Sequence, residues 1–337
     1  MAMKQIKIGT ATLIHGDCEE FMKDLPDKSF DLIIVDPPYY ETKGEFDFIW
    51  KSFDDYLSDV EIWANELKRI SKDSASLFWW GNSKKIAYTQ IILDKYFNLE
   101  NSMIWEKKDS IQYQYYSADL ARCFNTHNER VLYYSCEKGI TGREFVEAEY
   151  IAPRNPFSLY LQSEFKRAGV TNKDIAKLFP SKTGGLTGCV SNWLNGNNVI
   201  TLEQYQTIKD HLNGDYLRKE YDELRKEYDE LRKEYDELRR PFNNTAKLTE
   251  VLSFSQQSSE TRKNNHPTQK ALKLTESLVN VTAKHKGKAY IPFVGSGTEV
   301  IACLNAGMEV YGSERDEDYF NAAVERVIKS QQQQKLF

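Results

Sequence analysis

The chain has 337 residues, 40% of them hydrophobic and 13% aromatic, which gives room for one large α/β domain and a smaller one. Its net charge of −5 excludes a protein that coats nucleic acid through general basicity, so any DNA contact must use local basic patches. With no Cys-x-x-Cys spacing among five cysteines, no signal peptide and no bilayer-length apolar run, we expect a cytoplasmic protein without metal, disulfides or membrane contact.

The N-terminal residues predict one strand followed by one helix. Ile6 to His15 has the composition of a short strand, and Cys18 to Lys23 that of an amphipathic helix. Asp17 lies between them, where its side-chain oxygen can cap the helix. Capping is therefore the simplest role for Asp17.

The most informative stretch begins at Phe30 to Val35, an apolar run that predicts a buried parallel strand. Pro37 and Pro38 cannot extend a sheet, so the backbone must turn out at the carboxyl end of this strand, where α/β sheets bind ligands. The turn presents the Asp36 carboxylate, the Pro37 carbonyl and the Tyr39 ring at one rim. These groups suit a planar exocyclic amine, although an acidic turn without function remains the alternative at this point.

Helical and strand patterns alternate after this turn. Residues 40–53 are polar and aromatic without a regular period, which makes them a candidate lid over the substrate. The alternation predicts a doubly wound, mostly parallel α/β sheet. The expected helices are Tyr56 to Ser71 and Lys84 to Phe97, and the expected strands are Ser76 to Trp80, Ser102 to Glu106 and Arg130 to Ser135.

Residues 151–245 predict a helical insert, and its first part, 152–212, contains several short helices. Phe157 to Ala168, Lys173 to Phe179 and Cys189 to Leu194 are the helical stretches. The last two resemble the helix-turn-helix of repressor-type DNA-binding domains, with a longer break than the usual turn. A plain helical insert is the alternative. The resemblance, with the local excess of basic residues, indicates DNA contacts by Lys166, Arg167, Lys173, Lys177, Lys182, Ser191 and Asn192.

Residues 215–240 contain a seven-residue repeat that starts at Leu217, Leu224 and Leu231. Its leucines and tyrosines alternate four and three apart, which predicts one helix of roughly 33 Å with a single apolar stripe. A stripe this short is marginal as a free coiled coil, so it should pack on the protein itself or on a second subunit in a homodimer.

The C-terminal part, from 246, returns to the α/β pattern. A loop at Ser255 to Asn265 precedes His-Pro-Thr-Gln-Lys, in which Thr268 can cap a helix over Ala271 to Thr282. A glycine-rich turn, Pro292 to Thr298, then separates a strand from an apolar helix. Glu314 ends the next strand, near the offset at which an acid meets ribose hydroxyls.

Asp-Pro-Pro-Tyr and Pro-Phe-Val-Gly-Ser-Gly-Thr in one chain resemble the motifs of the β group of site-specific DNA adenine-N6 methyltransferases. The resemblance covers 1–150 and 246–337 as a catalytic domain, and it implies a circularly permuted Rossmann-like methyltransferase sheet that carries the insert. It assigns Asp36, Pro37, Pro38 and Tyr39 to catalysis. It assigns to the S-adenosyl-L-methionine site Asp17, Cys18, His266, Thr268, Lys270, Pro292, Phe293, Gly295, Ser296, Gly297, Thr298 and Glu314.

The resemblance further implies methyl transfer to adenine N6 in a specific sequence of double-stranded DNA, after the base is flipped out of the helix. Such enzymes serve restriction–modification or epigenetic marking, so a cognate restriction endonuclease is an expected partner. Ile291 departs from the family, which has an acid there that helps to bind the methionine end of the cofactor. This predicts weaker cofactor binding, which an aspartate should restore. Cytosine-N4 or RNA adenine methylation, and an inactive DNA-binding relative, remain alternatives.

Overall fold

The computed structural model describes residues 4–40, 49–107, 127–136, 150–181, 185–213, 215–255 and 269–334. The chain divides into two compact units. Unit 1 comprises Met1–Thr141 together with Arg240–Phe337, and unit 2 comprises Gly142–Arg239. The insert predicted from the sequence, 151–245, begins and ends a few residues after unit 2 does.

The described part of unit 1 contains a nine-stranded sheet with the order β1-β2-β9-β8-β3-β4-β6-β5-β7. The central run from β2 to β4 is parallel, whereas β6 is antiparallel to both of its neighbours. The mostly parallel α/β fold expected from the sequence is therefore confirmed. The strands are β1 Lys4–Ile8, β2 Ala11–His15, β3 Phe30–Val35, β4 Ser71–Gly81, β5 Asn98–Lys107, β6 Asn128–Ser135, β7 Val251–Phe254, β8 Lys288–Ile291 and β9 Glu309–Glu314.

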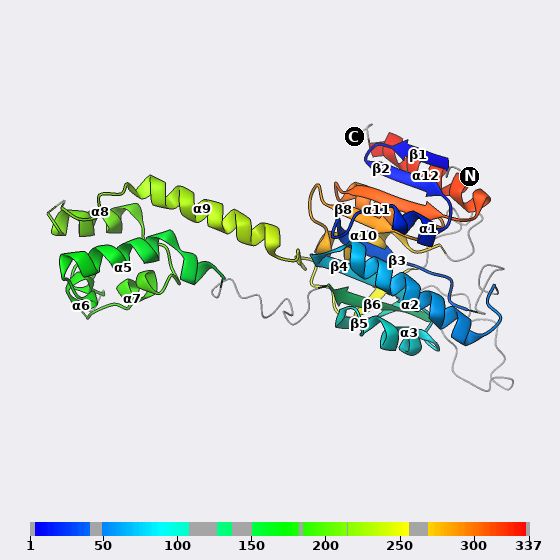
Figure 1. The fold of residues 1–337 in the computed structure, drawn as a ribbon, viewed down its shortest axis with the longest axis horizontal. Coiled ribbons are helices and arrows are strands. Elements are labelled where there is room, and N and C mark those ends of the chain that lie inside the picture. Colours follow the sequence, from blue (N-terminus) through cyan, green and yellow to red (C-terminus); the bar gives the residue numbers. More distant parts are fainter. Residues whose placement is uncertain are drawn as a thin grey trace. The chain divides into compact units, whose positions relative to one another are not determined.

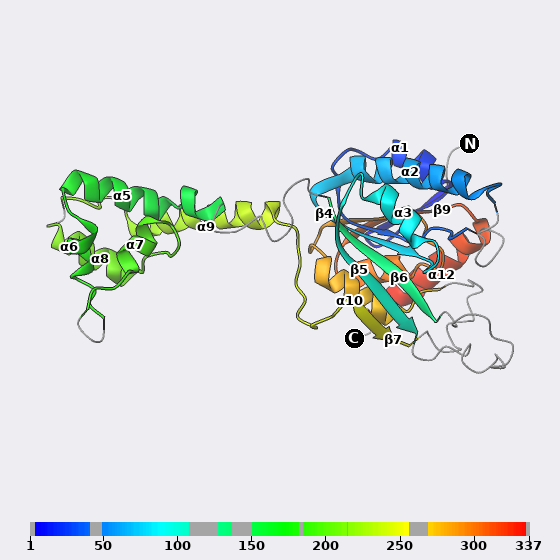
Figure 2. The ribbon, with the colours of Figure 1, turned by 90° about the horizontal axis from the view of Figure 1, so that it is seen from below.

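Helices cover both faces of this sheet (Figures 1 and 2). Helices α1, α2 and α3 pack over one apolar cluster, and α10, α11 and α12 over the other. The sheet is thus doubly wound, as the sequence predicted. The helices are α1 Cys18–Lys23, α2 Phe53–Ile70, α3 Ile86–Leu93, α10 Leu272–Thr282, α11 Thr298–Asn305 and α12 Glu317–Gln334.

Strand β3 lies at the centre of the sheet, and all six of its residues are buried. Leu32 and Ile34 enter the cluster beneath α10 and α11, while Ile33 and Val35 enter the cluster beneath α1 and α2. Its parallel neighbours are β4 and β8, so the catalytic turn and the glycine-rich turn leave adjacent strands at the same edge. Residues far apart in the chain are thereby brought together.

The single strand predicted over Ile6 to His15 is wrong. The structure has two antiparallel strands, β1 and β2, joined by a turn at Gly9 and Thr10. Gly9 has φ of 59°, a left-handed conformation that suits glycine and reverses the chain. Only β2 reaches the parallel part of the sheet, where it pairs with β9.

Unit 2 is helical and has its own core. Its elements are the 3₁₀ turn η3 Ala152–Arg154 and the helices α5 Pro156–Ala168, α6 Asn172–Ala176, α7 Cys189–Leu194, α8 Leu202–His211 and α9 Tyr221–Leu238. Phe157, Ile175 and Trp193 belong to a buried cluster shared by α5, α6 and α7. Between α6 and α7 the chain forms a bridge from Pro180 to Leu186, so these helices are not joined by a short turn.

The helix predicted from the seven-residue repeat begins at Tyr221, not at Leu217. Leu217 has φ of 54° and is fully buried, and its backbone N–H donates to Glu164 Oε2 at 2.7 Å. The first repeat is therefore an irregular anchor to α5. From Tyr221 onward the stripe packs within unit 2, where the Tyr221 ring lies 5.1 Å from that of Phe157. No helix in the described ranges is long and apolar enough to cross a membrane.

Candidate active site

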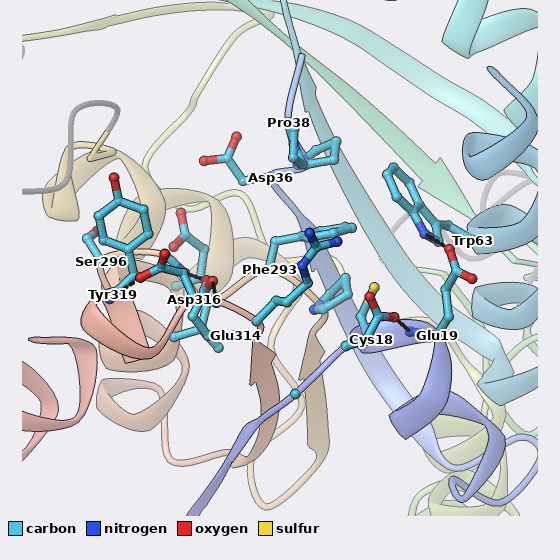
Figure 3. A pocket seen from close by; sticks show the side chains of 18 of the residues that line it. Cys18, Glu19, Asp36, Pro38, Trp63, Phe293, Ser296, Glu314, Asp316 and Tyr319 are labelled. Carbon is cyan, nitrogen blue, oxygen red and sulfur yellow. Dashed lines mark hydrogen bonds between the residues drawn. The ribbon is translucent and has the colours of Figure 1, made fainter. Parts of the chain in front are cut away.

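Unit 1 contains a pocket of about 740 Å³ at the carboxyl ends of β2, β9, β8 and β3. Figure 3 shows Glu314, Asp316 and Tyr319 on one side of this pocket and Cys18, Glu19 and Trp63 on the other, with Phe293 between them. Asp36 and Pro38 lie at the adjoining rim. This edge of a parallel sheet is where α/β proteins bind nucleotides and related ligands.

The catalytic turn holds Asp36 against a lysine and a tyrosine. Lys270 Nζ donates to Asp36 Oδ1 at 2.8 Å and to Oδ2 at 2.7 Å, although the two residues are 234 positions apart. The Tyr39 hydroxyl donates to Asp36 Oδ1 at 2.5 Å and accepts from Lys270 Nζ at 3.0 Å. These contacts fix the orientation of the carboxylate at the end of β3.

A second carboxylate, Glu129 on β6, shares the Lys270 ammonium at 3.2 Å and also pairs with Lys107. Burial raises the pKa of Asp36 above its usual value, and Lys270 offsets only part of this effect. Burial would also raise the pKa of Glu129, but its two lysines outweigh burial and lower it. Burial opposes the charge of Lys270, yet Asp36 and Glu129 raise its pKa, so the lysine stays charged. The site thus contains one permanent cation between two acids.

The glycine-rich turn after β8 approaches the pocket through its backbone. Gly295 and Gly297 have φ of 50° and 77°, left-handed values that favour glycine. Gly295 N–H donates to Glu314 Oε2 at 2.8 Å, and Asp316 N–H donates to Glu314 Oε1 at 2.9 Å. Each carboxylate oxygen keeps a lone pair for a further donor, so Glu314 can also accept from a ligand hydroxyl. Burial raises the pKa of Glu314, and its backbone donors counteract part of that rise.

On the opposite wall, the turn from β2 into α1 combines carboxylates with aromatic rings. Asp17 Oδ1 caps α1 by accepting from Glu19 N–H at 2.8 Å, as the capping interpretation predicted. The Glu19 carboxylate accepts from Trp63 Nε1 at 2.8 Å, and burial raises the Glu19 pKa more than this bond lowers it. The Trp63 and Phe293 rings meet edge to face, with centroids 4.9 Å apart. This wall can accommodate a flat heterocycle beside polar acceptors.

The structure brings most of the predicted site residues of unit 1 together. The catalytic turn, Asp17, Cys18, Lys270 and Glu314 line the pocket, as do Pro292, Phe293, Gly295 and Ser296 of the glycine-rich turn. Gly297 and Thr298 are not among the lining residues, and they begin α11 behind this turn. Lys270, which the resemblance assigns to the cofactor, contacts Asp36 instead; its cofactor role stays a prediction. His266, Thr268 and most of the candidate lid (41–48) lie outside the described residues.

Several pocket residues escaped the sequence interpretation. Trp63 occupies the apolar stripe of α2, which is indistinguishable from core packing by period alone. Glu299 had the clearest signal, because it is the one charged residue between Val294 and Ala306. The remaining lining residues that were not predicted include His15, Glu19, Asp59, Asp316 and Tyr319, whereas Ile49 and Trp50 belong to the candidate lid over 40–53.

Ile291, the position where the family has an acid, is fully buried at the end of β8. Its side chain belongs to the same apolar cluster as Val294 and Val300, and it does not line the pocket. An acid at this position would thus face an apolar core. Among the residues described, no cluster of histidine, cysteine, aspartate and glutamate is arranged to hold a metal ion.

Comparison with known proteins agrees with the fold and the motifs. The DNA methylase family model, which spans N6 and N4 enzymes, matches residues 30–325. The chain belongs to this family. Type II methyltransferase M.HinfI of Haemophilus influenzae is 28% identical over 59% of this chain and 66% of its own length. Type II methyltransferase M1.MboII of Moraxella bovis is 22% identical over 91% of this chain and 92% of its own.

Solved structures support the same fold for this DNA methylase. The M1.HpyAVI–SAM complex superposes with a TM-score of 0.53 at 16% identity and covers 94% of this chain and 98% of its own. PvuII DNA methyltransferase, described as cytosine-N4-specific, gives a TM-score of 0.53 at 10% identity, covering 96% of this chain and 92% of its own. At these identities the likeness establishes the fold alone.

The residues predicted to bind DNA belong to unit 2 of the methylase. Lys166, Lys173, Ser191 and Asn192 are exposed on α5, α6 and α7. Arg167 and Lys177 are also exposed, but each is paired with an acid three residues earlier, at 2.6 and 3.0 Å. Lys182 lies outside the described residues. The role of these side chains in DNA binding stays a prediction.

Proposed function

We propose that this DNA methylase transfers a methyl group from S-adenosyl-L-methionine to adenine N6 within a specific sequence of double-stranded DNA. The observation that carries the proposal is the juxtaposition of Asp36 and Tyr39 with the pocket beneath the glycine-rich turn. Asp36 also favours adenine over cytosine in the family. The 31% identity over 104 residues to the DNA adenine methyltransferase YhdJ of Escherichia coli supports the same base.

The charge of the pocket and the chemistry of its lining residues suit the cofactor. S-adenosyl-L-methionine supplies an electrophilic methyl group on a positively charged sulfonium. Carboxylates outnumber lysines and arginines among the lining residues, which suits a cationic ligand. We expect Glu314 to accept ribose hydroxyls, and Trp63 and Phe293 to contact the adenine ring.

At the catalytic turn, the Asp36 carboxylate and the Pro37 carbonyl accept the two N–H groups of the substrate amine, while the Tyr39 ring stacks on the base. Fixing the amine in this way aims its lone pair at the methyl carbon. The ionised carboxylate stabilises the positive charge that develops on nitrogen, and the methylated nitrogen then gives its surplus proton to water. Lys270 and Tyr39 orient Asp36 through their hydrogen bonds. Because N6 lies inside the base stack, the adenine must be flipped into the pocket.

Unit 2 is the proposed DNA-reading module. Lys166 and Lys173 are its best candidates for phosphate contacts, because both are exposed and neither has an ion pair within the described ranges. Ser191 and Asn192, exposed on α7, can reach polar groups of DNA. The relatives named type II methyltransferases support a place in restriction–modification, opposite a cognate endonuclease.

The decisive experiment is sequencing of modified bases in DNA from cells that lack other DNA methyltransferases and express this chain. We expect N6-methyladenine at one recurring sequence and none with an empty vector. N4-methylcytosine at a recurring site would establish the cytosine alternative. Unmodified DNA, together with DNA binding by the purified protein, would favour an inactive DNA-binding relative.

A further inference from the structure

Glu299 is a buried carboxylate that the reaction described above does not use. It is the second residue of α11, its side chain lines the pocket, and only 4% of the residue is exposed. An acid in the first turn of a helix often stabilises the helix dipole, but such acids are normally solvated. Within the described part of the chain, Glu299 Oε1 accepts no hydrogen bond. A buried carboxylate in this condition is costly unless a ligand completes it.

The charged groups around Glu299 are already engaged elsewhere. Lys270, two residues before the start of α10, is paired with Asp36 and Glu129. Arg326 on α12 donates to the Ser296 carbonyl at 2.8 Å and to Thr298 Oγ1 at 2.7 Å. Asp36 faces Glu299 as a like charge. Burial foremost, and then Asp36, raises the pKa of Glu299 to about 7, although Lys270, the residue's own backbone N–H and Arg326 counteract part of the rise.

A ligand that brings a cation with N–H donors would satisfy both the charge and the free oxygen of this carboxylate. The sulfonium of the cofactor has no N–H, but its amino-acid end carries an α-ammonium group. The partial positive charge at the N-terminus of α11 also favours the neighbouring α-carboxylate. The first turn of α11 therefore combines features for both charges of a zwitterion.

We propose that Glu299 binds the α-ammonium group of S-adenosyl-L-methionine and supplies the carboxylate that the family has at position 291. This inference rests on the proposed function, since it takes that cofactor as given. Ile291 faces the apolar cluster, whereas Glu299, eight residues later, reaches the pocket that Ile291 does not. In this chain the carboxylate would thus stand at position 299 instead of 291, where it can still contact the cofactor.

The test is calorimetry on the full chain and on Glu299→Gln with three ligands. S-adenosyl-L-methionine carries both charges of the amino-acid end, its decarboxylated form keeps only the amine, and 5′-methylthioadenosine lacks that end entirely. A charge-assisted hydrogen bond contributes about 1.5–3 kcal/mol. We expect Glu299→Gln to weaken the first two ligands by roughly ten- to hundredfold and methylthioadenosine by less than about twofold. Retained methylthioadenosine binding also shows that the variant is folded.

Equal weakening of all three ligands would make Glu299 a structural residue and overturn the proposal, as would unchanged binding of S-adenosyl-L-methionine. If the wild-type chain binds neither S-adenosyl-L-methionine nor methylthioadenosine, the proposed function fails and this inference fails with it. The pH dependence gives a second readout. Because Glu299, with its pKa near 7, must lose its proton to hold an ammonium, wild-type affinity should rise from pH 6 to pH 8. The affinity of Glu299→Gln for S-adenosyl-L-methionine should not increase over this pH range. An increase that persists in the variant would count against the proposal.

Discussion

At the catalytic turn, one ammonium group pairs with two partly buried acids. Lys270 bonds both oxygens of Asp36 and also contacts Glu129, which Lys107 pairs from the other side. Because Glu129 has the second lysine, it holds its negative charge more firmly than Asp36 does. Asp36 is therefore the acid that is less strongly held by lysines and can better accept hydrogen bonds from a substrate amine.

Replacing Asp36 with alanine should strongly reduce methyl transfer while leaving the fold intact. The variant loses the acceptor that orients the amine, which we expect to lower turnover by about 10²–10⁴-fold. Lys270 retains Glu129 as a partner, so no cation is left alone in the interior. Asp31→Ala is a control, because Asp31 is a buried acid on β3 that bonds Lys72 and the Lys288 N–H away from the pocket. It should lower stability without changing turnover per folded molecule, whereas wild-type turnover in Asp36→Ala would refute the assignment.

Ile291→Asp provides the complementary test of the motif. From the sequence alone, this change should tighten cofactor binding, but the buried, apolar setting of Ile291 reverses that expectation. An unpaired carboxylate there should lower the free energy of unfolding by about 3–5 kcal/mol without raising cofactor affinity. Ile291→Val, as a control, should cost only about 0.5–1.5 kcal/mol. Urea unfolding and calorimetry measure both quantities, and tighter binding at unchanged stability would contradict the structural explanation.

At the scale of elements, the seven-residue repeat places nearly identical sequence in different surroundings. Leu224 and Leu231 occupy equivalent positions of the repeat, yet Leu224 is 1% exposed within the core of unit 2 and Leu231 is only half-buried on α9. Leu224→Ala should therefore destabilise unit 2 by about 2–5 kcal/mol, and Leu231→Ala should cost clearly less. Thermal unfolding of the full chain compares them directly. Equal losses would mean that the second half of the stripe is also buried, as it would be in a dimer.

Features set by local sequence could be predicted, whereas contacts between distant parts of the chain could not. Strand β3 and its turn were predictable because an apolar run that ends in two prolines admits few structures. The partners of Asp36 were not, because Lys270 and Glu129 reach it from elements far along the chain. The repeat predicted a helix and its stripe, but identical repeats carry no information on which one meets α5. The start at Tyr221 likewise follows from the bond between Leu217 and Glu164, a tertiary contact.

At the scale of the whole molecule, α9 is the last element of unit 2 and leads into unit 1 at Arg239 and Arg240. If unit 2 reads the DNA sequence, the length of α9 should affect how recognition and catalysis are aligned. Deleting residues 224–230 joins Glu223 to Leu231, so that Leu231 and Tyr235 replace Leu224 and Tyr228 in register. The core of unit 2 is then preserved while the helix becomes about 10 Å shorter.

We expect this deletion variant to fold and to bind S-adenosyl-L-methionine as the wild type does, but to methylate another site or to lose most of its DNA methylation. Deleting only residues 224–227 is the contrasting variant, because it rotates the stripe by about 40° and removes Leu224 from the core without an equivalent replacement. That variant should lose stability as well as methylation. If the seven-residue deletion methylates the same sequence at the same rate, α9 does not act as a spacer. A contact between two copies would then explain the repeat better, and sedimentation should show a dimer for the wild-type chain that the shortened helix weakens.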